Sequence, residues 1–238
     1  MAILSQQYFL IALLIGAASG VVGSFVILKR MALVGDALSH VALPGIAIAL
    51  FWKTDPFWGA LVFLVLAAFL VWWLEGRTRL ASDAIVGLLF TASLAAGILG
   101  IPGEEILESL FGSFLPLSPL AFAAVAVAAV VIIIAVLLAT KRILLSIFAP
   151  DIAAIADPSR RATLFFLIIF SITVALGSKL VGTLLMGALT IVPAALAKNV
   201  SRSMVSYVTL SGVIGGVIAG GGALLADKLA LAPGPVII

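Results

Sequence analysis

The chain has 238 residues, of which 64% are hydrophobic and only 10% are charged, with a net charge of +3 and a mean hydropathy of +1.38. Soluble domains carry about 25% charged residues, so this composition excludes a water-soluble globule and predicts an all-α, polytopic membrane protein. The absence of cysteine excludes disulfides, thiolate metal ligands and cysteine catalysis, and basic residues that fall between apolar segments give no reason to expect nucleic-acid binding.

Eight apolar segments follow one another along the chain, each close to the roughly 20 helical residues that cross a bilayer core. We therefore expect a single transmembrane domain over residues 1–238 with about eight helices. The sixth and seventh segments are short and only Lys179 separates them, so one of the two is expected to be broken or tilted. The expected spans are Tyr8–Leu28, Val34–Trp52, Phe57–Leu74, Asp83–Gly100, Pro119–Ala139, Ala162–Ser178, Leu180–Ala197 and Met204–Ala226.

Glycines recur at every fourth position in the first and last of these spans. They are Gly16 and Gly20 in the first, and Gly212, Gly216 and Gly220 in the last. Small residues at this spacing let another helix approach closely. We therefore expect both spans to pack tightly inside the bundle.

The second span carries two ionisable side chains, Asp36 and His40, and His40 is the only histidine of the chain. Their i, i+4 spacing puts both on one helix face, and they lie about 9 Å and about 15 Å into the helix at 1.5 Å per residue. Pro44 has no N–H and therefore frees the backbone carbonyl of His40. A carboxylate, an imidazole and a carbonyl oxygen suit zinc, manganese or ferrous iron. We interpret Asp36 and His40 as ligands of a divalent metal ion in transit.

A structural role is the alternative, in which Asp36 and His40 bond to each other or to a neighbouring helix. Ionisable side chains in hydrocarbon are costly, and a passing cation would make both of them tolerable. Two side chains do not complete a coordination shell. The remaining ligands are expected from other helices, from a second copy of the chain or from water.

The longest outer loop, residues 101–118, contains three glutamates. The loop is either simply solvated or forms a surface that docks a partner or attracts metal ions, and the sequence leaves both open. The glutamates are Glu104, Glu105 and Glu108.

A short, mildly amphipathic helix is expected near residues 150–158, between the fifth and sixth spans. Pro150 and Asp151 favour a helix start there, and Pro158 favours a stop. Such a helix is either a simple connector or a coupling helix, through which a membrane subunit contacts a motor subunit. The residues that would make this contact are Asp151, Ile152, Ala153, Ala154, Ile155 and Ala156.

The basic residues divide unevenly between the two sets of loops, with ten of the 13 on one side and three on the other. The positive-inside rule makes the richer side cytoplasmic, and an even number of spans then places both termini outside the cytoplasm. The richer side has Lys29, Arg30, Arg77, Arg79, Lys141, Arg142, Arg160, Arg161, Lys198 and Arg202; the other has Lys53, Lys179 and Lys228.

The sequence lacks the motifs of an ATPase or a hydrolase. No Gly-Lys dipeptide occurs, which excludes a phosphate-binding loop of the G-x-x-x-x-G-K-[ST] type. A single histidine and no cysteine leave no nucleophile–base pair for hydrolysis. We therefore expect a transport subunit and not an enzyme, with no permanently bound cofactor.

The residues around Asp36 and His40 resemble the signature of the permease subunit of zinc, manganese and iron ABC importers. The block Arg30–Gly45 is quite specific to that family, and supporting blocks follow in the family's order over most of the chain. Where the family has Phe-Asp before its coupling helix, this chain has Phe148-Ala149. The supporting blocks are Thr78–Gly87, Leu110–Ser113, Ile147–Asp157, Val181–Ala194 and Ala232–Pro235.

The resemblance implies a homodimeric helical permease of the inner membrane, akin to the vitamin B12 importer fold. It implies two cytoplasmic ATP-binding subunits and an extracytoplasmic metal-binding protein as partners. Carried over, Asp36 and His40 would be metal-pathway ligands, and ATP hydrolysis in the partner would switch access through the helix around Ile152–Ala156. The cargo would be Zn²⁺ or Mn²⁺, with Fe²⁺ also compatible.

Two other functions remain open at this point. A secondary metal transporter would use the same Asp36–His40 pair with protons as the driving ion. A purely structural membrane scaffold would need neither side chain for transport. The coupling-helix segment and the family blocks favour the ATP-driven importer.

Overall fold

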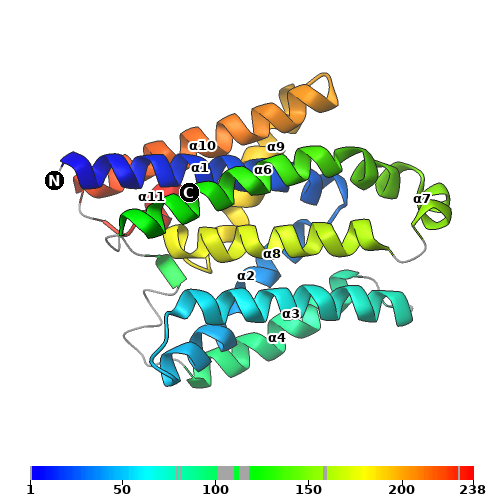
Figure 1. Ribbon diagram of the computed structural model, residues 1–238, viewed down its shortest axis with the longest axis horizontal. Coiled ribbons are helices and arrows are strands. Elements are labelled where there is room, and N and C mark those ends of the chain that lie inside the picture. Colours follow the sequence, from blue (N-terminus) through cyan, green and yellow to red (C-terminus); the bar gives the residue numbers. More distant parts are fainter. Residues whose placement is uncertain are drawn as a thin grey trace.

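The computed structural model describes residues 2–78, 80, 82–100, 110–112, 118–157, 160–229 and 231–238. These residues form helices and no strand, which confirms the all-α prediction (Figure 1). The helices are α1 (Ala2–Leu28), α2 (Ala32–Phe51), α3 (Pro56–Arg77), α4 (Ser82–Gly100), α6 (Pro119–Phe148), α7 (Pro150–Ala156), α8 (Arg161–Val181), α9 (Met186–Val200), α10 (Met204–Leu229) and α11 (Pro233–Ile237).

Each expected span corresponds to a helix, but the helices are not equal in length. Within the described ranges, five helices are long and apolar enough to cross a membrane, namely α1, α3, α6, α8 and α10. The other three are shorter apolar helices, with the stretches Asp36–Phe51, Ala84–Gly97 and Met186–Val200. The polytopic prediction is therefore confirmed, whereas the count of eight spans holds only loosely.

The expected boundary at Lys179 between the sixth and seventh spans is wrong by a few residues. Helix α8 continues through Lys179 to Val181, and α9 begins only at Met186. Gly182 ends α8 with φ of 80°, a left-handed conformation that glycine adopts without strain. Helix α9 has only 15 residues and is the shorter of the two.

Helix α6 is longer than the expected fifth span. It runs for 30 residues and continues nine residues past Ala139, to Phe148. Lys141 and Arg142 are good helix formers, so the end of the apolar segment gives the chain no reason to leave the helix. The extension carries Arg142 to the α7 end of the bundle, where this side chain lines a cavity described below.

Helices α1 and α10 lie side by side, and glycines set their separation (Figure 1). A Cβ added at Gly16 would lie 2.5 Å from the Cβ of Ala219, and one added at Gly216 would lie 3.1 Å from the carbonyl oxygen of Leu13. The Tyr207 hydroxyl donates to the Ser24 carbonyl at 3.1 Å across the same interface. The tight packing expected from the glycine spacing is confirmed.

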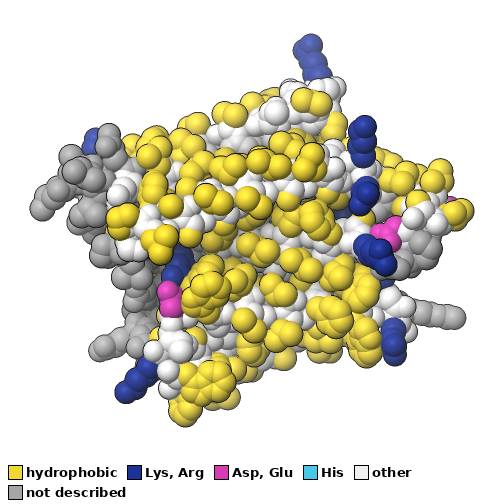
Figure 2. Space-filling view, in the orientation of Figure 1, with side chains coloured by type: hydrophobic (Ala, Val, Ile, Leu, Met, Phe, Trp, Pro, Cys, Tyr) yellow, Lys and Arg dark blue, Asp and Glu magenta, His cyan; other side chains and the backbone are white. Residues whose placement is uncertain are grey.

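Helix α2 is held inside the bundle by contacts with α3, α4, α8 and α9. Both ends of the chain lie toward the end of the molecule opposite α7 (Figure 1). Basic side chains gather at the α7 end, and a smaller group of charged side chains lies at the other end (Figure 2). The charge division expected from the sequence thus corresponds to the two ends of the bundle.

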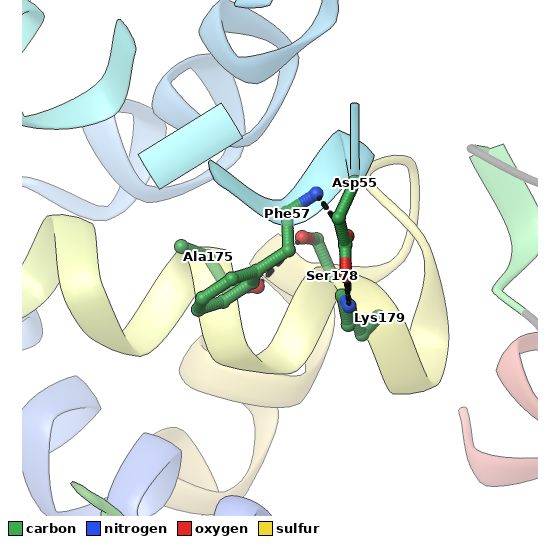
Figure 3. A network of polar contacts seen from close by, with 5 residues as sticks. All are labelled: Asp55, Phe57, Ala175, Ser178 and Lys179. Carbon is green, nitrogen blue, oxygen red and sulfur yellow. Dashed lines mark hydrogen bonds and ion pairs between the residues drawn. The ribbon is translucent and has the colours of Figure 1, made fainter. Parts of the chain in front are cut away.

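An ion pair joins the start of α3 to α8 (Figure 3). The Asp55 carboxylate caps α3 by accepting from the Phe57 N–H at 2.8 Å, and the Lys179 ammonium donates to its two oxygens at 3.0 and 3.1 Å. The same ammonium lies 5.0 Å from the centroid of the Phe57 ring. Partial burial alone would raise the pKa of Asp55, but the Phe57 N–H and Lys179 outweigh it and hold the pKa below its ordinary value.

We expect Asp55→Asn to lower the thermal stability of the detergent-solubilised protein at neutral pH by a small amount. Because folding lowers the pKa of Asp55, the pair's contribution is present above the unfolded value of about 3.9 and is lost as the pH falls through the folded value. The pair is half-exposed, so screening keeps the effect below about 1 kcal/mol. Melting temperatures of both proteins measured from neutral pH down to about pH 3 should converge. A gap that stays constant over this range would contradict the assignment.

Candidate functional site

Helix α2 carries both predicted metal ligands, Asp36 and His40, but places them in different surroundings. His40 is buried, with 7% of its surface exposed, whereas Asp36 is exposed. The helix runs on through both residues and through Pro44 without a break. The two side chains therefore lie one turn apart along α2, with the carboxylate accessible and the imidazole inside the bundle.

The buried imidazole of His40 rests against an aromatic ring of α4. Its centroid lies 5.2 Å from that of Phe90, with the two planes at 71°. The Nδ1 atom is buried and has no hydrogen-bond partner among the described residues. A buried polar atom in this condition is costly to the fold. The imidazole therefore has hydrogen-bonding or ligating capacity that packing alone does not use.

The carboxylate of Asp36 lies against the start of α9. A Cβ added at Gly187 would lie 2.7 Å from Asp36 Oδ1 and 2.8 Å from its Cα. Only glycine therefore fits at this position without moving α2 or α9. The sequence pattern does not distinguish Gly187 from the other glycines, although it falls inside the family-like block Val181–Ala194.

Pro44 and a glycine contact shape the next turn of α2. Proline at this position removes the N–H that would bond to the His40 carbonyl. One residue later, Gly45 packs on α3, where an added Cβ would lie 2.8 Å from the Cβ of Phe63. Within about two turns, α2 thus offers a carboxylate, an imidazole and a backbone carbonyl oxygen without its usual intrahelical hydrogen bond.

The described residues hold no group of three or more His, Cys, Asp or Glu side chains that could bind a metal ion. Asp36 and His40 therefore supply two side-chain ligands at most, and backbone oxygens, water or a second copy would supply the rest. A site that takes up and releases an ion must bind it weakly enough for it to leave. The donor set suits transit better than storage.

The expected short helix is present as α7, at the end of the bundle where basic side chains gather (Figures 1 and 2). Two of its large apolar side chains are exposed, Ile152 at 59% and Ile155 at 83%, and Phe148 at the end of α6 is 73% exposed. Asp151 is also exposed. Exposed large apolar side chains make this helix a candidate contact surface.

Some predicted features fall outside the described residues. They are the loop glutamates Glu104, Glu105 and Glu108, the side chain of Ala154, and the helix-stopping Pro158.

The model of the ABC 3 transport family matches residues 2–238 of the chain. The manganese import system permease protein ScaB of Streptococcus gordonii is 30% identical over 215 residues, 88% of this chain and 77% of ScaB. The high-affinity zinc uptake system membrane protein ZnuB of Haemophilus influenzae is 26% identical over 91% of this chain and 85% of its own length. The solved structure of PsaBC from Streptococcus pneumoniae in complex with Fab superposes with a TM-score of 0.79 and 29% identity, covering 98% of this chain and 86% of the matched chain.

Proposed function

The chain belongs to the ABC 3 transport family and is a multi-pass permease subunit, and we propose that it carries a divalent transition-metal ion, Mn²⁺ or Zn²⁺, across the membrane. The observation that carries the proposal is the ligand pair of α2. An exposed carboxylate stands one turn from a buried imidazole whose Nδ1 has no partner among the described residues. An ion entering from the side opposite α7 would reach His40 first and pass to Asp36, with Gly187 keeping α9 close to the carboxylate.

The relatives favour manganese and zinc over iron. ScaB is named for manganese import and ZnuB for zinc uptake, and iron, which the resemblance also allowed, has no support among these two. One imidazole and one carboxylate fit either manganese or zinc. Selection between the two ions then falls to the remaining ligands and to the protein that delivers the ion.

The permease would work as a homodimer that alternates access under the control of ATP. Membership of the family implies ATPase subunits and a substrate-binding protein as partners. We propose that α7 docks into the ATPase through Ile152 and Ile155, which places the α7 end in the cytoplasm and both termini outside. This orientation agrees with the gathering of basic side chains at the α7 end.

Uptake into proteoliposomes distinguishes this function from a proton-coupled transporter. The permease would be reconstituted with its ATPase subunit, and radioactive Mn²⁺ or Zn²⁺ offered with its binding protein. We expect uptake that requires ATP on the α7 side and persists when an uncoupler removes the proton gradient. Uptake that needs no ATP and stops with the uncoupler would favour the alternative function.

A further inference from the structure

A cavity of about 1120 Å³ opens at the α7 end of the bundle, and neither Asp36 nor His40 lines it. Residues from the second half of α6, from α7 and from the start of α8 line it, and the ends of α1 and α3 reach it. Binding sites for small molecules have volumes of about 300–1,000 Å³. The cavity is therefore large enough for an organic ligand.

The charged lining of this cavity is mainly positive. Two acidic side chains face four basic ones, and both acids are already engaged: Glu75 pairs with Arg160 at 2.7 Å, and Asp157 accepts from the Ala162 N–H at 2.9 Å. Within the described ranges, no carboxylate lies at ion-pair distance from the other two arginines. The charged lining residues are Lys29, Arg142, Arg160, Arg161, Glu75 and Asp157.

The lining changes from charged to apolar along both principal helices. On α6, Arg142 is followed toward the middle of the bundle by Ala139, Leu138 and Ala135, which share its face and extend about 10 Å from it at 1.5 Å per residue. On α8, Arg161 lies nearer the end of the bundle, and Phe165 follows it one turn further inward. The cavity thus has a basic mouth at the end of the bundle and an apolar wall that runs inward.

We propose that this cavity binds one anionic glycerophospholipid from the leaflet at the α7 end. Arg142 and Arg161 would hold the phosphodiester, and an acyl chain would lie along Leu138, Ala135 and Phe165. A basic mouth repels a divalent cation, so the cavity is unsuited to be a branch of the metal path. Clustered basic residues beside membrane helices attract anionic headgroups, and an apolar wall distinguishes a lipid from a free anion. The proposal depends on the chain being a membrane permease and not on which metal it carries.

Native mass spectrometry of the intact permease with its ATPase subunit tests this proposal. The complex, stripped of lipid in a mild detergent, would be titrated with phosphatidylglycerol or phosphatidylcholine. We expect one phosphatidylglycerol per permease chain in clear preference to phosphatidylcholine. The double substitution Arg142→Gln with Arg161→Gln should weaken this binding by at least about tenfold, because each basic residue contributes to headgroup attraction. Lys198→Gln with Arg202→Gln removes the same charge elsewhere in the chain and should leave the binding unchanged.

A second pair of variants keeps the test decisive if the arginine variant fails to fold. Ala139→Phe fills the apolar wall without changing charge and should also weaken phosphatidylglycerol binding, whereas Val131→Phe on an exposed face of α6 should not. Equal binding of both lipids, or equal loss in the control variants, would overturn the proposal. Competition by millimolar inorganic phosphate would indicate a site for a soluble anion and would overturn it too.

Occupation of the cavity by protein is the remaining alternative. The chain has no native cysteine, so Leu138→Cys introduces a single thiol beside the cavity. In membranes we expect this thiol to react with a lipid-soluble maleimide and to form no cross-link with a second permease or with the ATPase subunit. An efficient cross-link to either protein would show a subunit interface and overturn the lipid assignment.

Discussion

Replacing either ligand of the α2 pair should abolish metal uptake. In proteoliposomes that contain all partners, we expect Asp36→Ala and His40→Ala each to reduce the initial rate of Mn²⁺ or Zn²⁺ uptake by about 100-fold or more. The reason is that each substitution removes a side chain that we propose ligates the ion directly, and the loss of residues that merely orient a ligand already costs about 10–100-fold in metal affinity or activity. The measurement is ATP-dependent accumulation of radioactive metal.

Controls separate the loss of a ligand from the loss of packing. Asp36→Asn and His40→Gln preserve size and hydrogen bonding but are poor ligands, so they should be almost as defective as the alanine variants. Leu43→Ala truncates another buried side chain of α2 and should retain most of the uptake if the protein assembles. Undiminished uptake in both alanine variants would leave the pair with a structural role.

Placing a charged side chain on α7 should prevent the permease from binding its ATPase subunit. We expect Ile155→Asp to prevent co-purification of the ATPase subunit and to reduce ATP-driven uptake at least tenfold, because a central apolar contact typically contributes about 2 kcal/mol or more. Ile155 is 83% exposed on a seven-residue helix, so its replacement should not disturb the fold. Pull-down of the ATPase subunit and uptake in the same preparation measure the two effects.

A charged substitution far from α7 shows whether the loss of ATPase binding depends on where the charge is placed. Leu231, ahead of α11, is 53% exposed, and Leu231→Asp should leave co-purification of the ATPase subunit unchanged. Metal binding to the Asp36–His40 pair should persist in Ile155→Asp, because the described residues of α7 pack mainly on α6. If Ile155→Asp still carries its ATPase subunit and transports at the normal rate, α7 is a connector and not the coupling element.

The sequence predicts features that depend on local pattern and leaves out those that depend on long-range contact. The four-residue spacing of glycines such as Gly16 and Gly216 predicts close helix packing, and α1 and α10 pack closely as expected. The break between α8 and α9 depends on the left-handed conformation of Gly182, which hydropathy does not reveal. The extra turns of α6 are missed for the same reason, since Lys141 and Arg142 end the apolar segment but not the helix.

In the candidate site too, the sequence pattern identifies the residues but not their long-range contacts. Asp36 and His40 are found by their charge and spacing, but their contacts with Gly187 of α9 and Phe90 of α4 join segments far apart in the sequence. The basic cavity combines residues from α6, α7 and α8 with the ends of α1 and α3. Hydropathy and spacing within a single segment do not show that these residues meet.

The most direct test of the account is whether the imidazole of His40 binds the transported ion. Mn²⁺ bound to the purified permease complex would be examined by pulsed electron paramagnetic resonance, which detects ¹⁴N nuclei coordinated to the metal. Because the chain has a single histidine, a ligating imidazole nitrogen in this permease can come only from His40. We predict a ¹⁴N coupling that disappears in His40→Gln, with Asp36→Asn weakening Mn²⁺ binding. Bound Mn²⁺ with no nitrogen coupling in the unchanged permease, or a coupling that survives His40→Gln, would contradict the assignment.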